Sequence, residues 1–254
     1  MARNQQKHAV VKKAYGSLAK RGGSCCSSSG SSCCAPPAPG RPVPEADLGL
    51  SCGDPVAFSQ IREGDVVLDL GSGAGKDVFI AAEKVGPKGK AIGVDMTPEM
   101  LDLARKNAEL YRKRTGLNNV EFREGTIEKL PMPKSSVDLI ISNCVINLSP
   151  NKPKVFKEAF RVLRRNGRMV VSDIVLNREL PASAKRSTDL YVGCIAGALL
   201  REEYLRAIRK AGFTTVAVLN DRTFARRTAR EARESEVGKM LEGAAASITV
   251  LATK

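Results

Sequence analysis

Aromatic side chains are scarce in this sequence: its 254 residues include no tryptophan, and aromatic residues make up 4%. Proteins that bind single-stranded nucleic acid stack the bases on aromatic rings, so this composition argues against such a partner. The formal net charge of +14 would suit nucleic acid, but the basic residues are scattered and most alternate with acidic ones. We therefore interpret the charge as a solvated basic surface and expect no nucleic-acid partner.

Long apolar segments are also missing from the sequence. No run reaches the roughly 18 apolar residues that a membrane-spanning helix needs, and residues 1–13 lack the apolar core of a signal peptide. We therefore expect a cytoplasmic protein with no membrane partner. Its thiols are expected to be reduced, because the cytoplasm opposes disulfide formation. The seven cysteines are an odd number, which does not fit a complete disulfide framework.

The most informative stretch is an apolar run at residues 66–70 followed by Gly71, Gly73 and Gly75. The run is typical of a buried parallel strand. Glycine allows a positive φ and the close approach of a ligand, and the start of the helix expected after Gly75 offers unpaired N–H groups. The stretch therefore predicts a strand, a turn and a helix that together form a nucleotide-type site.

The acidic residues around this stretch narrow the choice of ligand. A dinucleotide fingerprint, G-x-G-x-x-G/A, requires a small residue at position 76, where this chain has Lys76. Instead, Asp69 precedes the glycines. Asp95 ends the next expected strand, about 20 residues after Gly75, where a carboxylate can accept hydrogen bonds from ribose hydroxyls. This pattern resembles class I S-adenosylmethionine methyltransferases more closely than dehydrogenases.

Strands and helices alternate along the rest of the chain, which predicts parallel βαβ units and an α/β fold. The expected strands are residues 66–70, 91–94, 120–124, 137–142, 168–174, 216–219 and 248–252. The expected helices are residues 10–19, a segment after the glycines, 98–111, 154–165 and 202–211. We divide the chain into residues 1–46, an N-terminal helix with a Cys-rich and Pro-rich flexible segment, and a domain of residues 47–254.

Three cysteines lie inside the expected domain: Cys52, Cys144 and Cys194. Their wide separation does not match a close-spaced zinc motif, and any one of them alone would be interpreted as a small buried apolar side chain. Cys144, however, follows the fourth expected strand, at the edge of the sheet where such folds bind ligands. Because thiolates are soft ligands, the three together indicate a site for a soft acceptor.

Several segments together resemble the bacterial and archaeal arsenite methyltransferases and cover nearly the whole chain. The more specific segments are residues 141–150, which contain Asn-Cys-Val-Ile-Asn-Leu, and 191–199, which contain Gly-Cys-Ile-Ala-Gly-Ala. The others are residues 11–16, 22–26, 48–55, 67–75, 93–100 and 171–176. The resemblance implies a Rossmann-like class I methyltransferase sheet in the order 3-2-1-4-5-7-6. It also implies an antiparallel last strand, helices on both faces and small C-terminal additions.

The same resemblance implies the ligands and the residues that bind them. It assigns arsenic(III), as substrate, to the thiolates of Cys52, Cys144 and Cys194, and S-adenosylmethionine as the methyl donor. The implied cofactor residues are Asp69, Gly71, Ser72 and Gly73 at the methionine end, Asp95 and Met96 at ribose and adenine, Ile127 and Glu128 at the adenine edge, and Asn143. Arsenite and methylated arsenicals are the implied substrates, and a thiol such as thioredoxin or glutathione is the implied reductant.

Elementary chemistry supports a reaction without a general base. Arsenic(III) held by three sulfurs keeps a lone pair that can attack a sulfonium methyl, which fits a chain whose single histidine, His8, lies in the N-terminal tail. The remaining cysteines lie on a Ser-rich segment that cannot form a core, where a tether raises the local thiol concentration. We expect them to capture arsenite and pass it on: Cys25, Cys26, Cys33 and Cys34.

The sequence departs from the family pattern at two places. The family usually has Gly-Cys-Gly-Asn-Pro where residues 51–55 are Ser-Cys-Gly-Asp-Pro, and the charge of Asp54 would disfavour the Cys52 thiolate. The Pro-rich residues 35–44 are shorter than the family's corresponding segment, which alters how this segment can cover the site.

Three alternatives to arsenite methylation remain open from the sequence. They are a methyltransferase for a quinone or another small molecule, a metalloid-binding protein without catalysis, and an RNA methyltransferase. Arsenite binding distinguishes the first, cofactor binding the second, and salt-dependent RNA binding the third.

Overall fold

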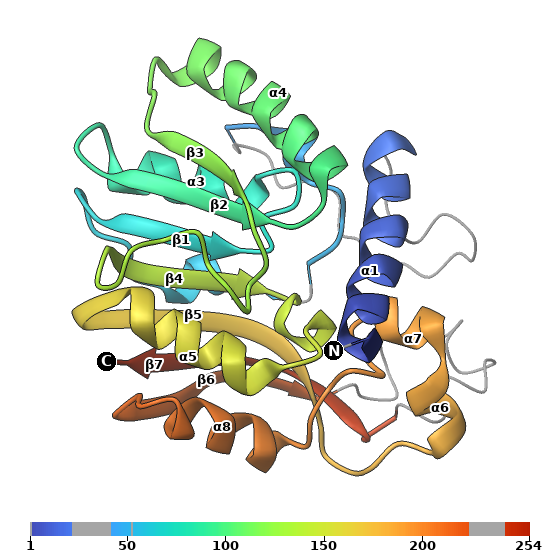
Figure 1. Ribbon diagram of the computed structural model, residues 1–254. Helices are drawn as coiled ribbons and strands as arrows, with labels where there is room; N and C mark the ends of the chain where they lie inside the picture. Colours follow the sequence, from blue (N-terminus) through green and yellow to red (C-terminus); the bar gives the residue numbers. More distant parts are fainter. Residues whose placement is uncertain (1, 22–41, 52, 224–241) are drawn as a thin grey trace.

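Seven strands form one sheet in the order β3-β2-β1-β4-β5-β7-β6 (Figure 1). The computed structural model describes residues 2–21, 42–51, 53–223 and 242–254. The strands are β1 Val66–Leu70, β2 Lys90–Asp95, β3 Val120–Glu124, β4 Val137–Asn143, β5 Leu163–Leu176, β6 Thr215–Thr223 and β7 Ala245–Thr253. Strands β1 to β5 pair in parallel, and β7 is antiparallel to both β5 and β6. The expected α/β class, strand order and antiparallel last strand are therefore confirmed.

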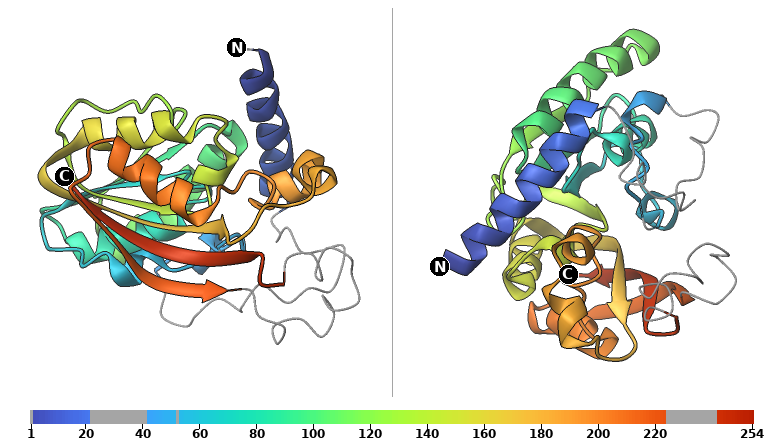
Figure 2. Two further views of the ribbon diagram at one scale, coloured as in Figure 1. Left: turned by 90° about the horizontal axis from the view of Figure 1, so that it is seen from below. Right: turned by 90° about the vertical axis from the view of Figure 1, so that its right-hand side faces the viewer.

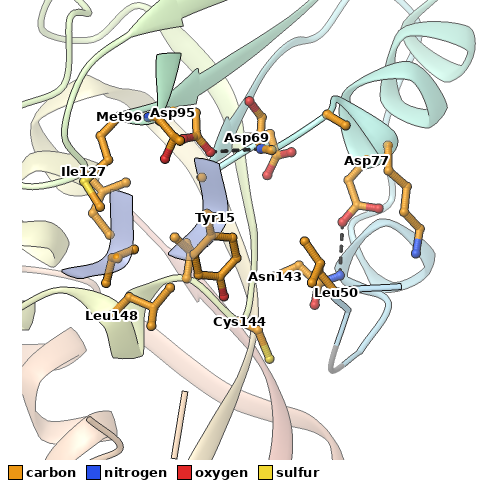
Figure 3. A pocket seen from close by; sticks show the side chains of 18 of the residues that line it. Tyr15, Leu50, Asp69, Asp77, Asp95, Met96, Ile127, Asn143, Cys144 and Leu148 are labelled. Carbon is orange, nitrogen blue, oxygen red and sulfur yellow. Dashed lines mark hydrogen bonds between the residues drawn. The ribbon is translucent and has the colours of Figure 1, made fainter. Parts of the chain in front are cut away.

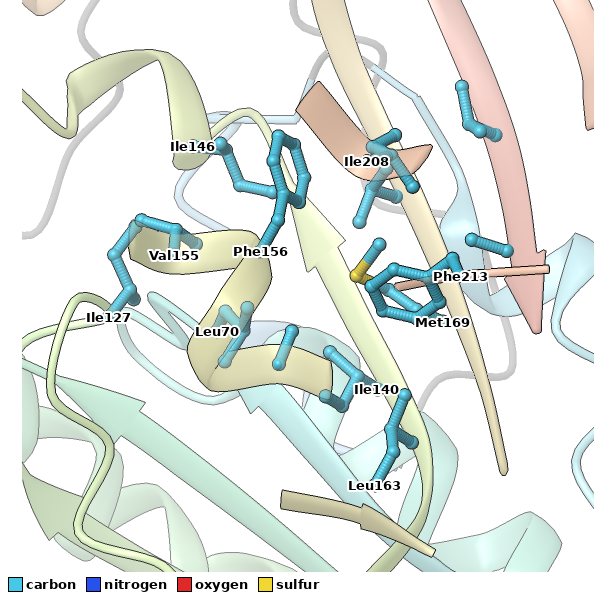
Figure 4. Packing of buried hydrophobic residues seen from close by; sticks show 14 of the residues in the cluster. Leu70, Ile127, Ile140, Ile146, Val155, Phe156, Leu163, Met169, Ile208 and Phe213 are labelled. Carbon is cyan, nitrogen blue, oxygen red and sulfur yellow. The ribbon is translucent and has the colours of Figure 1, made fainter. Parts of the chain in front are cut away.

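Strand β1 is central because its side chains are apolar on both faces of the sheet. Val67, Leu68 and Leu70 are fully buried, as expected for a parallel strand covered by helices on both sides. Helices α2 Pro55–Phe58, α3 Lys76–Val85 and α4 Pro98–Thr115 contribute to the core on one face, and α5 Lys152–Val162 and α8 Arg201–Lys210 to the core on the other. In Figure 4, Phe156 of α5 and Ile208 of α8 are part of the second core.

The end of α5 differs from the sequence expectation of a helix over residues 154–165. The helix ends at Val162, and β5 begins at Leu163, which pairs with Val137 of β4 and is fully buried. The next pairing in this register joins Arg168 to Leu139, so the residues between them form an irregularity in β5. Asn166, with φ 62°, lies in that irregularity. The Asn166-Gly167 pair therefore lies in a bend of β5 and does not end α5. The helix ends earlier because Leu163 pairs with β4 and is buried in the sheet.

Helix α1, Ala2–Arg21, is longer than the expected residues 10–19 and lies across the carboxyl ends of the central strands (Figures 1 and 2). It runs beside α4 and also contacts the turn η2, Ile146–Leu148, and α7, Thr188–Val192. Val11 is buried in these contacts. The helix is thus packed on the sheet domain, which its polar sequence does not predict.

Three short elements complete the described chain: η1 Pro44–Ala46, α6 Ala182–Arg186 and α7. They pack around the carboxyl end of the sheet, where α6 and α7 stand beside α1 in Figure 1. Among the described helices, none combines the length and apolar character that crossing a membrane requires.

Candidate active site

A pocket lies at the carboxyl ends of β1, β2 and β4 (Figure 3). Ligand pockets in open α/β sheets lie where the strand order reverses, here between β1 and β4. Every residue that the sequence resemblance assigns to the cofactor lines this pocket, together with Cys144: Asp69, Gly71, Ser72, Gly73, Asp95, Met96, Ile127, Glu128 and Asn143. The structure therefore places one predicted thiol in the same cavity as the whole predicted cofactor set.

The loop after β1 holds its glycines in conformations that other residues rarely adopt. Gly71, Gly73 and Gly75 have φ values of 67°, 51° and 97°. A Cβ atom on Gly71 would lie 2.3 Å from Val145 Cγ2, whereas a Cβ atom on Gly73 would meet nothing nearer than Met100 Sδ at 4.0 Å. The loop is thus packed tightly against the β4 side and open at Gly73, where a ligand can approach the backbone.

Three carboxylates give the pocket an acidic end. Burial raises the pKa of Asp69 well above its usual value of 3.8, and the neighbouring charges of Asp77 and Asp95 raise it further. Burial also raises the pKa of Asp95, although hydrogen bonds from backbone N–H groups, including Gly73 N at 3.0 Å, oppose that shift. A cation in the pocket would relieve this repulsion.

The donor set fits S-adenosylmethionine, which carries a sulfonium and an ammonium group at one end and an adenosine at the other. The carboxylates suit the cationic end, and Asp95 at the end of β2 suits ribose hydroxyls. Met96, Ile127 and Leu148 form an apolar wall on the other side of the pocket, as Figure 3 shows. The pocket therefore matches this cofactor in charge and polarity.

Helix α1 supplies a wall of the pocket that the sequence analysis did not foresee. His8, Val11 and Tyr15 line the cavity. His8 Nε2 lies 3.0 Å from Glu128 Oε1, which also accepts a hydrogen bond from the Ser149 hydroxyl. The interpretation of His8 as a tail residue is therefore wrong. Residues 11–16 resemble the family and could have pointed to Tyr15, whereas nothing in the sequence marked His8.

The structure brings two of the three predicted arsenic-binding cysteines together. Cys194 Sγ donates to the carbonyl of Cys144 at 2.7 Å, and both side chains are buried. Both residues have positive φ, 56° at Cys144 and 64° at Cys194. Non-glycine residues in this region cost about 1–3 kcal/mol each and cluster at functional sites. Both cysteines thus have strained backbone conformations, and Cys194 contacts Cys144, which lines the pocket.

The other predicted cysteines, Cys25, Cys26, Cys33, Cys34 and Cys52, lie outside the described residues. Within the described ranges, no group of three His, Cys, Asp or Glu side chains could hold a metal ion. Cys194 is not part of a disulfide, whereas Cys144 is disulfide-bonded. The expectation of reduced thiols therefore does not hold at Cys144.

Lys152 and Asp173, two buried residues of opposite charge type, lie near Cys194. Lys152 Nζ donates to the carbonyls of Asn147 at 3.2 Å and Ser149 at 3.1 Å, and burial lowers its pKa to about 8. Burial raises the pKa of Asp173 to about 7, against the opposing charge of Lys152. The Tyr204 hydroxyl donates to Asp173 Oδ2 at 3.2 Å. These groups fix the turn η2, which begins two residues after Cys144.

Comparisons with known proteins agree with this site. An arsenite methyltransferase of Halobacterium salinarum is 47% identical over 173 residues, 68% of this chain and 43% of that protein. The human arsenite methyltransferase is 39% identical over 152 residues, 58% of this chain and 40% of that protein. This chain thus matches less than half the length of these curated relatives.

A crystal structure and a family model complete the comparison. The structure of an arsenic(III) S-adenosylmethionine methyltransferase from Chlamydomonas reinhardtii is 40% identical, with a TM-score of 0.71, and the match covers 80% of this chain and 67% of that one. The predicted resemblance to arsenite methyltransferases is therefore confirmed. A family model described as a methyltransferase domain matches residues 61–212, and the chain belongs to this methyltransferase family.

Proposed function

We propose that the protein transfers a methyl group from S-adenosylmethionine to arsenic(III) held by the thiolates of Cys52, Cys144 and Cys194. The observation that carries this proposal is the contact of the Cys194 thiol with Cys144, which itself lines the pocket containing every predicted cofactor residue. Soft ligands beside a methyl-donor pocket suit a soft acceptor. The relatives named above, which are arsenite and arsenic(III) methyltransferases, support the same acceptor.

In the proposed reaction, arsenite binds three cysteine thiols: each S–H proton leaves with one arsenite hydroxyl as water, so three As–S bonds form and three waters are released. The bound cofactor supplies an electrophilic methyl on a sulfonium. The arsenic lone pair forms the As–C bond while the C–S bond breaks, so no proton moves and no general base is required. The new bond leaves arsenic formally pentavalent. Two of the cysteine sulfurs then join in a disulfide and so return arsenic to the trivalent methylated form, and a thiol reductant restores the two cysteines. The residues contribute by position: the cysteines orient the lone pair, and the walls formed by α1 and by residues 47–51 exclude water.

A thiol reductant is part of the proposal. The disulfide at Cys144 must be reduced before that sulfur can bind arsenic. Thioredoxin or glutathione would serve, and both belong to a reducing compartment such as the cytoplasm. We further propose that residues 47–254 form the methyltransferase domain and that α1 adds one wall to its site.

The direct test is methylation of arsenite by the purified protein with S-adenosylmethionine and excess thiol, followed by speciation of the arsenic products. We expect methylated arsenic and an equal amount of S-adenosylhomocysteine. Cys144→Ser and Cys194→Ser should abolish the reaction, whereas Ser142→Ala, a small change two residues before Cys144, should not. Cys52→Ser should impair the first methylation more than a later one, since monomethylated arsenic needs only two thiolates. Full activity in Cys144→Ser would contradict the proposed site.

The N-terminal cysteines are proposed to capture arsenite for the site. Replacing Cys25, Cys26, Cys33 and Cys34 together with Ser should lower the rate most at limiting arsenite and limiting thiol, because the chemical site lies elsewhere. At saturating arsenite and thiol the rate should recover. Loss of all activity under saturating conditions would contradict this role, as would an unchanged rate at limiting arsenite.

A further inference from the structure

Asn147, in turn η2, is bound by other residues at its N–H, its carbonyl and its side-chain amide nitrogen. The Asp173 carboxyl group accepts a hydrogen bond from Asn147 N, and Lys152 Nζ donates to the carbonyls of Asn147 and Ser149. Asn147 Nδ2 donates to the Ile174 carbonyl at 2.6 Å. Because Asn147 is fully buried, these groups depend on the partners that the fold supplies in place of water.

The loop that carries Cys194 packs against the same turn. The Tyr191 hydroxyl donates to the Leu148 carbonyl at 2.6 Å, and the Tyr191 carbonyl accepts from Cys194 N at 3.0 Å. A Cβ atom on Gly197 would lie 2.2 Å from the carbonyl oxygen of Asn147. The loop therefore lies directly against η2, and position 197 has no room for a side chain.

Cys144 begins the short segment that ends at Asn147. Its N–H donates to the Ser172 carbonyl at 2.8 Å, and its own carbonyl accepts from Cys194 Sγ. Strand β5 thus holds this segment at both ends, through Ser172 and through the adjacent Asp173. The contacts that bring the two cysteines together therefore converge on Asn147 and its two charged neighbours.

Lys152 and Asp173 influence each other through their charges. They are 7% and 1% exposed, and each charge favours the ionised form of the other against the effect of burial on its pKa. Salt screens this attraction less than that of a surface pair, because both groups lie away from bulk water. Loss of either charge would leave the other buried without its partner and would weaken the contacts with Asn147.

We propose that Lys152 and Asp173 are positioning residues for the arsenic acceptor, which fix Asn147 and thereby hold Cys144 and Cys194 where one arsenic can bond to both. The proposal rests on the function proposed above. Both cysteines have positive φ, and such conformations persist only where the surrounding contacts enforce them. Neither charged group is a ligand of arsenic, and each acts through η2.

The test uses phenylarsine oxide, whose trivalent arsenic bonds to two thiols, and a full-length protein that keeps only Cys144 and Cys194. The other five cysteines are replaced by Ser: Cys25, Cys26, Cys33, Cys34 and Cys52. Lys152→Met keeps the apolar stem and removes the charge. It should weaken phenylarsine oxide binding by about 10-fold or more, because bonding of both sulfurs to one arsenic depends on their positions. Lys157→Met, at an exposed position on α5, should leave the affinity unchanged.

A double-mutant cycle separates the charge pair from a general loss of structure. Asp173→Asn should also weaken phenylarsine oxide binding. Lys152→Met/Asp173→Asn should bind no more weakly than the weaker single variant, because neither charge is then left unpaired. Lys152→Arg keeps the charge and should recover part of the affinity. Losses that simply add in the double variant would contradict the role of the pair.

Gly197→Ala tests the contact between the loop and η2 without changing either charge. The new Cβ atom, 2.2 Å from the Asn147 oxygen, should separate the loop from the turn and weaken phenylarsine oxide binding. Gly193→Ala is the matched control, since its Cβ atom would meet nothing nearer than the Asp189 oxygen at 3.3 Å. Unchanged affinity in Lys152→Met would overturn the proposal. If urea unfolding shows that Lys152→Met does not fold, unchanged affinity in Gly197→Ala would overturn it.

Methylation of arsenite by the protein with all its cysteines distinguishes this proposal from the proposed function. If Lys152→Met weakens phenylarsine oxide binding but the wild type methylates no arsenite, the proposed function fails and the positioning role stands. If the wild type methylates arsenite and Lys152→Met binds phenylarsine oxide normally, the positioning role fails and the function stands.

Discussion

Gly71 is the position at which a single methyl group should most clearly disturb both the fold and the site. In Gly71→Ala the new Cβ would lie 2.3 Å from Val145 Cγ2 and 2.8 Å from Val145 Cβ, at a residue with φ 67°. Contacts shorter than 3 Å force the backbone or Val145 to move. Because Val145 directly follows Cys144, the displacement reaches the proposed acceptor site.

The expected cost has two parts. A non-glycine residue in the left-handed region costs about 1–2 kcal/mol, and inserting a methyl group into a packed site costs about 1–3 kcal/mol. We therefore expect Gly71→Ala to lower the free energy of unfolding by about 2–5 kcal/mol. The reduced entropy of the unfolded chain offsets this by up to about 1 kcal/mol.

The matched control is Gly116→Ala at the end of α4. Gly116 has φ 74°, but a Cβ there would meet nothing within 4 Å, so only the conformational cost and the entropy offset apply. Urea unfolding of both variants gives the free energy that each substitution costs, and the difference between the two costs is the contribution of the steric clash. Gly71→Ala/Val145→Ala should recover part of the loss. A cost in Gly71→Ala no larger than that in Gly116→Ala would refute the reasoning, since the clash would then contribute nothing.

Three further predictions concern buried polar groups. Since burial and neighbouring carboxylates raise the pKa of Asp69, its contribution to stability is fully present below pH 3.8 and lost as pH rises through the raised value. Binding of cationic S-adenosylmethionine should therefore release a proton, detected by calorimetry in buffers of different ionisation enthalpy, and Asp69→Asn should abolish this release. Tyr204→Phe removes the hydroxyl that donates to Asp173, a carboxyl whose pKa burial raises to about 7. The substitution should lower the free energy of unfolding in urea by about 1–3 kcal/mol. The loss should be larger above pH 7, where the carboxylate is charged and its hydrogen bond is stronger, and an equal loss above and below pH 7 would contradict this. Ser142→Ala removes a buried hydroxyl for which the described residues offer no hydrogen-bond partner, and its unfolding free energy should be equal to or above that of the wild type.

Much of the fold could be predicted because local signals agree with the global arrangement. The apolar run of β1 and the glycines after it predict a buried strand and a ligand turn from composition alone. The strand order needed the family resemblance, because periodicity indicates only alternating strands and helices. The end of α5 was predicted wrongly, because Asn166-Gly167 has the composition of a helix end, and pairing of Leu163 with Val137 is a long-range contact.

The candidate site was predictable where residues follow strand ends and unpredictable where side chains cross between elements. Asp69, Asp95 and Asn143 each lie at or near the carboxyl end of a strand, so topology alone brings them together. The contacts of His8 with Glu128 and of Lys76 with Asp47 join separate segments of the chain, and the hydrophobic pattern of the sequence does not predict that these segments meet. Such contacts depend on how α1 and residues 47–51 pack, and this packing is decided by the assembled core.

The most direct test of the proposed arsenic site is the count of sulfur neighbours around bound arsenic by X-ray absorption. The protein would carry Cys25, Cys26, Cys33 and Cys34 all replaced by Ser, so that only the domain thiols remain, and would be reduced and loaded with arsenite and S-adenosylhomocysteine. We predict three sulfur neighbours, and two after the further change Cys194→Ser. Oxygen neighbours alone in the first protein, or three sulfurs retained in the second, would contradict the assignment of arsenic to Cys52, Cys144 and Cys194.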